Sequence, residues 1–257
     1  MGSRTVLWLG GMSGVGKTTA GRAVARRYDL WFYSLDSRTY AHAEAMKVPA
    51  LEMTADQLWV DRTPQQMADD FEAESRRRFP LVLEDLAAIP DDGAPILVDG
   101  PQLLPDLVNG PALFLIATPA LQRALVSARG SLTYSRARDP KRALANRVRR
   151  DELLAARLRP LAVEVERVEE VEPLVVGFVR EHTPEWISRN DRGDVALRRR
   201  DENERRLDQW RRYAEVEPRV RDGTVDFACE CDRPGCTAVV PRTLAAASYR
   251  PRLAHGP

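Results

Sequence analysis

Short apolar runs alternate with longer amphipathic segments along residues 1–182 of the chain. The apolar runs are too short to be buried helices, and they predict buried strands. The expected strands cover residues 6–9, 30–35, 96–98, 112–117 and 161–165. The expected helices cover 19–28, 37–46, a segment from Thr63 that is interrupted at Pro80, 143–158 and 169–182. Strands that alternate with helices predict an α/β fold, a three-layer architecture with a five-stranded parallel sheet.

The pattern changes after residue 182. Residues 184–199 are polar and contain Pro184 and Gly193, which is typical of a linker. A strongly charged helix is expected from residue 200 to 214, followed by a cluster of three cysteines. We therefore expect a first domain at 1–183, a linker at 184–199, and a small module at 200–257 made of a helix and a Cys-rich segment.

The stretch Gly11-Met12-Ser13-Gly14-Val15-Gly16-Lys17-Thr18 lies between the first strand and the first helix and fits G-x-x-x-x-G-K-[ST], the Walker A loop. Glycines let consecutive backbone N–H groups turn onto a phosphate chain, and the helix N-terminus adds partial positive charge. We expect Lys17 to reach the β- and γ-phosphates of a nucleoside triphosphate and the Thr18 hydroxyl to ligate Mg²⁺. The expected nucleotide contacts are Gly11, Ser13, Gly14, Val15, Gly16, Lys17, Thr18 and Thr19.

Two aspartates follow neighbouring strands at the edge of the sheet where the loop lies. Asp99 is the Walker B candidate, a carboxylate that holds Mg²⁺ through its water shell or orients Thr18. Asp36 is the candidate general base, which would take the proton of an acceptor hydroxyl as that hydroxyl attacks the γ-phosphorus. Each has a structural alternative, because Asp99-Gly100 suits a turn and Asp36 suits a helix N-cap.

Residues 129–150 contain eight basic residues and one acidic residue, Asp139. A solvated helix face normally mixes both signs, so the segment predicts a cationic lid that neutralises the transferring phosphoryl group and excludes water. Arg129 and Arg138 are the expected catalytic contacts, followed by Arg147 and Arg150. Arg38, Tyr40 and Arg62 could contact an acceptor, and each is equally plausible as a surface residue.

Residues 4 to about 182 resemble the P-loop small-molecule kinase group, which includes shikimate and gluconate kinases, nucleoside monophosphate kinases and chloramphenicol phosphotransferase. The local likeness to the last lies in Asp36-Ser37 and Ala128-Arg129-Gly130. This resemblance implies that Asp36 is the general base and that Arg129 contacts nucleotide or phosphate. Asp36-Ser37-Arg38 also resembles the Asp/Arg pair of polynucleotide 5′-kinases, with a different spacing. Between residues 48 and 89, where such enzymes bind the acceptor, no substrate signature is recognised.

The cysteines form the pattern C-x-C-x₄-C with Cys229, Cys231 and Cys236. Residues two apart on a strand point the same way, and residues 233–235 supply a turn that returns Cys236 to the pair, so the pattern predicts a zinc site. His255 is the best candidate for the fourth ligand, with His182 or a carboxylate as alternatives. Three reduced, buried thiols are the competing interpretation. The segment resembles a short Cys-rich module of uncharacterised actinobacterial proteins, which implies a metal site and no reaction.

The bulk properties narrow the functional class. The formal net charge of +1 over 257 residues argues against a general nucleic-acid binder. We expect no signal peptide and no membrane span, and therefore a cytoplasmic protein. The main hypothesis is a kinase that uses ATP and Mg²⁺ to phosphorylate a hydroxyl of a small molecule. The alternatives are a kinase acting on a nucleotide or a polynucleotide 5′ end, with nucleic acid as a partner that we do not favour, and a nucleotide-binding regulator whose Cys-rich module docks a protein.

Overall fold

The computed structural model describes residues 4–48, 53–129, 136–217 and 220–247. Its centre is a five-stranded sheet in the order β2-β3-β1-β4-β5, and every neighbouring pair is parallel. The strands are β1 (Val6–Gly11), β2 (Trp31–Ser34), β3 (Ile96–Asp99), β4 (Ala112–Ala117) and β5 (Ala162–Val165). The predicted fold class is confirmed, and all five predicted strands are present.

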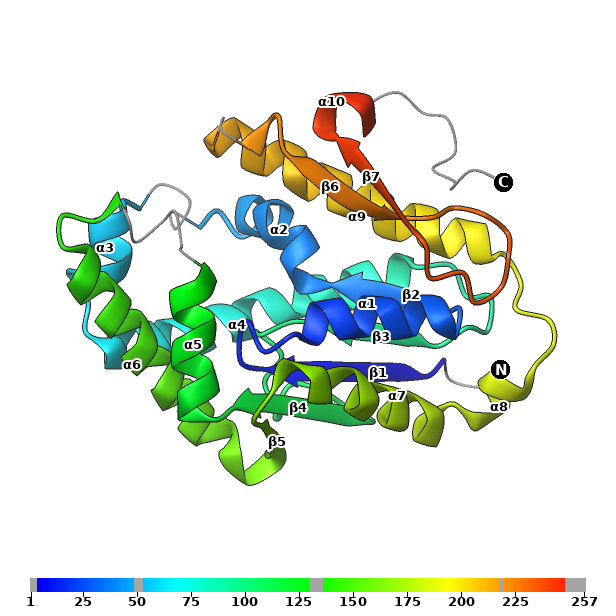
Figure 1. The fold of residues 1–257 in the computed structure, drawn as a ribbon, viewed down its shortest axis with the longest axis horizontal. Coiled ribbons are helices and arrows are strands. Elements are labelled where there is room, and N and C mark those ends of the chain that lie inside the picture. Colours follow the sequence, from blue (N-terminus) through cyan, green and yellow to red (C-terminus); the bar gives the residue numbers. More distant parts are fainter. Residues whose placement is uncertain (1–3, 49–52, 130–135, 218–219, 248–257) are drawn as a thin grey trace.

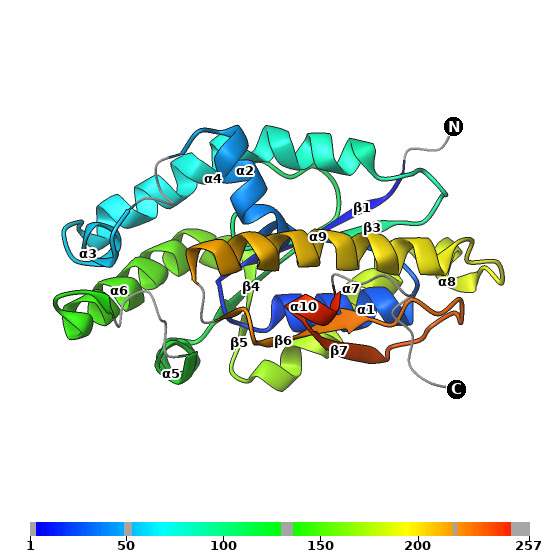
Figure 2. The same ribbon diagram turned by 90° about the horizontal axis from the view of Figure 1, so that it is seen from above.

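Helices cover both faces of the sheet (Figures 1 and 2). On one face α1 (Lys17–Arg27) packs against α7 (Val171–His182), and on the other α4 (Pro64–Ala88) packs against α6 (Pro140–Leu158). The shorter helices are α2 (Thr39–Ala45), α3 (Ala55–Trp59), α5 (Pro119–Arg129), α8 (Pro184–Ser188) and α10 (Leu244–Ala247). Single 3₁₀ turns occupy Leu35–Arg38, Arg159–Leu161 and Val168–Glu170.

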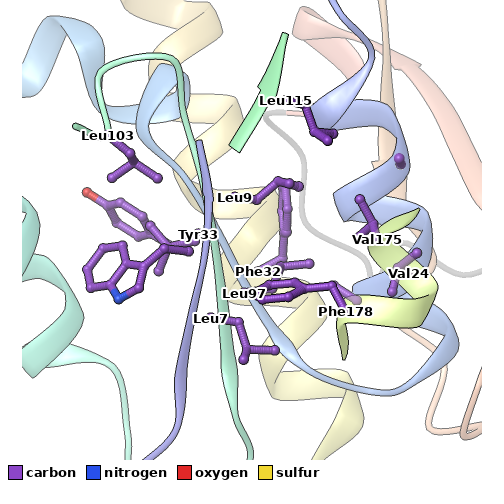
Figure 3. Close-up of a cluster of buried hydrophobic side chains, with 14 of the residues drawn as sticks. Leu7, Leu9, Val24, Phe32, Tyr33, Leu97, Leu103, Leu115, Val175 and Phe178 are labelled. Atoms are coloured by element: carbon purple, nitrogen blue, oxygen red, sulfur yellow. The ribbon is translucent and has the colours of Figure 1, made fainter. Parts of the chain in front are cut away.

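The core follows from the alternation of side chains along the strands. Leu9, Phe32 and Leu97 lie on the face toward α1, where a Cβ at Gly21 would come within 4 Å of all three. Figure 3 shows them beside Phe178 of α7, with Tyr33 on the opposite side of the sheet. The close contact at Gly21 lets α1 lie directly on the strands. This contact fixes the position of the helix whose first turn continues the Walker A loop.

Helix α4 differs from its prediction at Pro80. The helix begins as expected at Thr63, whose side chain and that of Gln66 form a reciprocal capping box. It then continues without a break through Pro80 to Ala88. Pro80 is exposed, so the carbonyl that loses its N–H partner lies on the face of the helix where water can replace it.

The C-terminal part of the chain lies against the α/β unit. Helix α9 (Val195–Val216) runs along the β2 edge of the sheet, and the antiparallel strands β6 (Thr224–Ala228) and β7 (Val239–Thr243) pack beside it (Figures 1 and 2). The range 184–199, expected as a linker, carries α8 and the start of α9. Among the described residues no helix has both the length and the apolarity needed to cross a bilayer.

Candidate functional site

The Walker A loop leaves the sheet at Gly11, which pairs with Leu115 of β4. Gly11 has φ +110°, and a Cβ there would lie 2.0 Å from the carbonyl oxygen of Leu115, so only glycine fits. Helix α1 begins at Lys17, with Gly16 as N-cap at φ +104°. The buried ammonium of Lys17 donates to the carbonyl oxygens of Gly11, at 3.1 Å, and of Met12. The cation is therefore held within the loop, at the N-terminus of α1.

Asp99 ends β3 beside this loop and is completely buried. Its Oδ2 accepts hydrogen bonds from the hydroxyls of Thr18, at 2.6 Å, and Ser34, at 3.3 Å. Its Oδ1 is buried and accepts no hydrogen bond from any described residue. Burial raises the pKa of Asp99 to about 6, although the Lys17 cation and the Thr18 hydrogen bond oppose the increase. An orphaned carboxylate oxygen next to a threonine hydroxyl is a donor set that suits Mg²⁺, so these residues fit the ion predicted from the sequence.

Asp36 lies in the 3₁₀ turn that follows β2, and its side chain is exposed. The negative charge of Asp36 acts on two buried neighbours, since it raises the pKa of Asp99 and that of Arg78. Burial is nevertheless the larger effect at Arg78 and lowers its pKa overall. The guanidinium of Arg78 donates to the carbonyl oxygen of Leu35 and to Gln102, which tethers the turn to the loop after β3. Arg78 therefore fixes the segment that presents the Asp36 carboxylate.

A second carboxylate, Asp85 in α4, organises the surroundings of this turn. It accepts hydrogen bonds from Tyr33 at 2.6 Å, Arg38 at 2.9 Å and His42 at 2.9 Å. Burial alone would raise the pKa of Asp85, but these three donors hold it well below its usual range. Arg38, considered from the sequence as an acceptor contact, is thus engaged by Asp85, and Tyr40 stacks on Tyr213 of α9.

A cavity of about 250 Å³ opens beside residues 11–13 at the start of the Walker A loop, and we call it the loop cavity. Phe71 of α4, Leu104 from the segment after β3, and Leu154 of α6 form much of its apolar wall. Its charged lining consists of three ion pairs, namely Arg76–Asp106, Arg150–Asp151 and Arg157–Glu72. The three positive and three negative groups balance, so the lining has no net charge.

A second cavity, of about 400 Å³, lies next to it between α3 and α4. Phe71 and Arg150 line both cavities, and Trp59 and Arg62 line the second. The guanidinium of Arg150 lies over the rings of Trp59 and Phe71. Arg62, an acceptor candidate from the sequence, forms an ion pair with Asp70.

The arginines of the expected lid occupy different places. Arg129 is the last residue of α5, and its side chain lies outside the described set, as do residues 130–135. Arg138 is exposed and pairs with Asp61, just after α3, at 2.5 Å and with Asp56, within α3, at 3.7 Å. Arg147 pairs with Asp151 at 2.7 Å. Among these candidates Arg150 is the one that lines the loop cavity, together with residues 11–13 of the phosphate loop.

Several residues of the site carry no clear sequence signal. Ser34 lies inside a predicted apolar run, and Arg78, Gln102 and Leu154 are ordinary positions on predicted helices or loops. Their roles depend on which elements meet at the strand ends, which no local pattern reveals. The one available signal was the position of Ser34, which ends a strand next to Asp99 in a parallel sheet.

The three cysteines come together as the spacing predicts. Their sulfur atoms all lie within 4.8 Å of one another, and none of the three is in a disulfide bond. Cys229 is buried, whereas Cys231 and Cys236 are half-buried. His255, the predicted fourth ligand, lies outside the described residues. His182 instead packs edge-on against Phe178.

No protein-family model matches the chain, and no curated protein matches its sequence. Solved structures with some likeness include a shikimate kinase from Bacteroides thetaiotaomicron, at 17% identity and a TM-score of 0.39, which covers 70% of this chain and 98% of that chain. A sugar kinase from Janibacter sp. aligns at 16% identity and a TM-score of 0.39, over 73% of this chain and 100% of that chain. Likeness at such low identities and TM-scores carries no functional conclusion, so the function must be inferred from the contacts within this chain.

Proposed function

We propose that this chain is a kinase that uses ATP and Mg²⁺ to phosphorylate a hydroxyl group of a small molecule. The observation that carries the proposal is the loop cavity, which opens directly on residues 11–13 of the Walker A loop. A protein that only binds or hydrolyses a nucleotide has no need of a further cavity beside the phosphate loop. A phosphotransferase needs one to hold the acceptor and exclude water.

In this proposal the donor half of the site consists of Lys17, Thr18 and Asp99. The backbone of the loop and the N-terminus of α1 bind the triphosphate, and Lys17 exchanges its carbonyl partners for phosphate oxygens. Mg²⁺, when bound by Thr18 and Asp99, would supply positive charge against the β- and γ-phosphates. The hydrogen bond between the Thr18 hydroxyl and Asp99 already places these two ligands side by side.

Asp36 would act as the general base for the acceptor hydroxyl. Its exposed carboxylate stands on a turn fixed by Arg78, close enough to Asp99 to affect the pKa of that group. Asp36 does not line the loop cavity, so an acceptor must reach from the cavity toward the end of β2 to meet it. Gln102, bonded to Arg78, belongs to the same segment as Leu104 in the cavity wall and connects the two regions.

The lining of the loop cavity indicates the class of acceptor. Its apolar wall favours a partly apolar molecule, and its balanced ion pairs give no net attraction for an anion. A nucleoside monophosphate would bring about two negative charges into a neutral lining, at a desolvation cost that no surplus cation offsets. We therefore favour a neutral hydroxyl compound as the substrate.

A screen for phosphoryl transfer tests the proposal. Neutral hydroxyl compounds and nucleoside monophosphates are each incubated with labelled ATP, with the Lys17→Ala variant as the blank. We expect labelled product from the neutral set. Transfer to nucleoside monophosphates alone would contradict the acceptor class, and hydrolysis without any labelled product would contradict the kinase.

Two variants locate the acceptor and the base. Leu154→Trp fills the loop cavity and should abolish transfer while slow ATP hydrolysis remains, whereas Leu83→Trp, at a leucine of α4 whose side chain is exposed, should have no effect. Asp36→Asn should bind ATP normally and lower kcat by about 10²–10⁴-fold. Transfer near the wild-type rate in Asp36→Asn would exclude Asp36 as the base.

A polynucleotide acceptor would need a free basic surface, for which the arginines of α9 are candidates. In the structure Arg198 and Arg199 are buried, where they pair with Asp92 and Asp29. Arg205 pairs with Asp201, an acidic residue on the same helix. These arginines stabilise the packing of α9 and do not form a free basic surface, so the small-molecule hypothesis remains the better supported one.

A further inference from the structure

The C-terminal cysteines lie at the opposite end of α1 from the phosphate loop. Cys229 follows β6, and Cys231 and Cys236 lie on the connection between β6 and β7. Their three sulfur atoms lie within 4.8 Å of one another. Thiolates around one tetrahedral zinc ion, with Zn–S bonds of about 2.3 Å, lie roughly 3.8 Å apart. The upper limit of 4.8 Å on the observed separations is compatible with the spacing of a zinc site.

A buried guanidinium, which also pairs with Asp29, lies beside the charge that such a site would carry. Three thiols that bind Zn²⁺ release three protons to solvent, and the resulting centre has a net charge of −1. The guanidinium of Arg199 lies 3.6 Å from the sulfur of Cys231 and donates to the carbonyl oxygen of the same residue at 2.7 Å. Arg199 is buried, so its positive charge is directed at the sulfur cluster and is little screened by water.

The same arginine connects the cysteines to α1. Its second nitrogen donates to Asp29, at 3.0 Å, and to the carbonyl oxygen of Arg233, at 3.1 Å. The backbone N–H of Gly235 also donates to Asp29, at 2.9 Å to one oxygen and 3.0 Å to the other. Asp29 follows the last turn of α1 and has a left-handed backbone, with φ +55°. The turn that carries Cys236 is thus bonded to the residue that directs the chain from α1 into β2.

We propose that Cys229, Cys231 and Cys236 bind a structural Zn²⁺ ion, and that this ion holds the turn at residues 233–236 against Asp29 and so fastens the C-terminal segment to the end of α1. Zn²⁺ is a borderline-soft ion that favours thiolates and tetrahedral geometry, and three thiolates leave one position for a further ligand. Without the ion the turn is held by hydrogen bonds alone. The site is separate from the phosphate loop and takes no part in phosphoryl transfer.

Metal analysis and cobalt substitution of the full chain test the proposal. The protein purified under reducing conditions should contain one zinc ion per chain. Removal of zinc by a chelator and titration with Co²⁺ should produce a thiolate-to-cobalt charge-transfer band that saturates at one equivalent. The absence of zinc together with the absence of this band in fully reduced protein would overturn the proposal, as would copper as the bound metal.

Variants identify the ligands and separate the site from catalysis. Cys231→Ser and Cys236→Ser, at the two half-buried ligands, should each weaken cobalt binding by at least about tenfold. Thr237→Ala, at an exposed neighbour, and Lys17→Ala, in the phosphate loop, should retain the full cobalt band. A full band in either cysteine variant would overturn the assignment. Because the wild-type titration needs no variant, misfolding of a variant leaves the test in place.

Hydrogen exchange tests the connection to α1. The amide of Gly235, which donates to Asp29, should exchange faster after zinc removal, whereas the amide of Ala20, which donates to Gly16 in the first turn of α1, should keep its rate. Equal protection of Gly235 with and without zinc would show that the ion does not hold the turn.

Discussion

Helix α1 has a buried aspartate near each of its ends, and the two carboxylates differ in how many of their oxygens accept hydrogen bonds. At the N-terminal end Asp99 uses one oxygen for the hydroxyls of Thr18 and Ser34, and its other oxygen is buried without a partner among the described residues. At the C-terminal end both oxygens of Asp29 accept hydrogen bonds, from Arg199 and from the Gly235 amide. Burial raises the pKa of each.

The Asp99 end has the bonding expected of a ligand-binding site. The Asp29 end, which we call the α1 joint (Asp29, Arg199 and Gly235), has the bonding expected of a structural contact. A buried, incompletely bonded carboxylate is costly, and a protein keeps one where a ligand completes its bonding. A buried carboxylate with both oxygens bonded, one of them by a guanidinium, contributes to the uniqueness of the fold. Changes at the Asp99 end should therefore alter catalysis first, and changes at the Asp29 end should alter stability first.

The largest expected effect comes from Lys17→Ala at the catalytic end. The variant removes the buried cation that we expect to stabilise the transferring phosphate, and transfer should fall by about 10³-fold. Arg180→Ala is a matched control, because it removes a cation from an exposed position in the last turn of α7 and should leave the rate unchanged. Steady-state kinetics with MgATP measure both, and equal losses in the two variants would show that the effect is not specific to the loop.

The second-largest effect is a loss of stability at the α1 joint, and the Asp29→Asn variant should show it. Asparagine tolerates the left-handed backbone and can keep the Gly235 hydrogen bond, but it leaves the buried guanidinium of Arg199 without its counter-charge. The free energy of unfolding should fall by about 3–5 kcal/mol. Urea denaturation measures the loss, with the exposed Asp222→Asn as the control. A loss in kcat at unchanged stability would reverse the roles assigned to the two ends.

Features that depend on neighbouring residues in the chain could be predicted from the sequence. The apolar runs predicted all five strands, and the Walker A spacing predicted the strand, loop and helix around Gly11 and Lys17, although α1 begins at Lys17 and not at the expected residue 19. The expected interruption at Pro80 was wrong, because the proline falls on the exposed face of α4 and the helix continues through it. Whether a proline breaks a helix depends on which face meets water, and the sequence of the helix alone does not determine that.

The contacts made by distant segments could not be predicted in the same way. The residue pairs Asp29–Arg199 and Arg78–Leu35 join elements far apart along the chain. The sequence of α9 does not distinguish exposed arginines from buried ones, and Arg199 is a buried partner of Asp29. Two roles stay predictions: Asp36 as the general base, and Arg129 as part of the lid.

The third effect is a change in pH dependence at the catalytic end. Asp99 has its pKa raised to about 6, above the value of about 3.9 in an unfolded chain, so between these values the folded protein holds a proton that the unfolded chain loses. The contribution of Asp99 to stability is therefore complete below about pH 4 and is lost as the pH rises through about 6. Asp99→Asn should remove this decline and raise the free energy of unfolding at pH 7 by about 1–3 kcal/mol.

The same substitution should also lower Mg²⁺-dependent transfer, by less than Lys17→Ala does, because the amide cannot supply the negative oxygen. In the wild type, the affinity for MgATP should weaken as the pH falls below about 6, where Asp99 becomes protonated. Urea unfolding at several pH values and magnesium titrations measure the two halves of this prediction. An Asp99→Asn variant that is less stable than the wild type at pH 7 would show that the wild-type carboxylate is fully bonded, like Asp29.

The smallest expected effect comes from an exposed ion pair near the α1 joint, and it is the reference for the stability effect of Asp29→Asn. Arg27, at the last residue of α1, pairs with Glu172 at 3.0 Å, and the two side chains are 48% and 44% exposed. A double-mutant cycle with Arg27→Ala and Glu172→Ala should give a coupling energy of about 0.2–1 kcal/mol, which added salt reduces because water and ions screen an exposed pair. The loss caused by Asp29→Asn, only two residues further along the chain, should hardly change with salt, since that pair is buried. A coupling between Arg27 and Glu172 that matched the Asp29 effect would mean that surface charge, and not the buried aspartate, fastens this end of the helix.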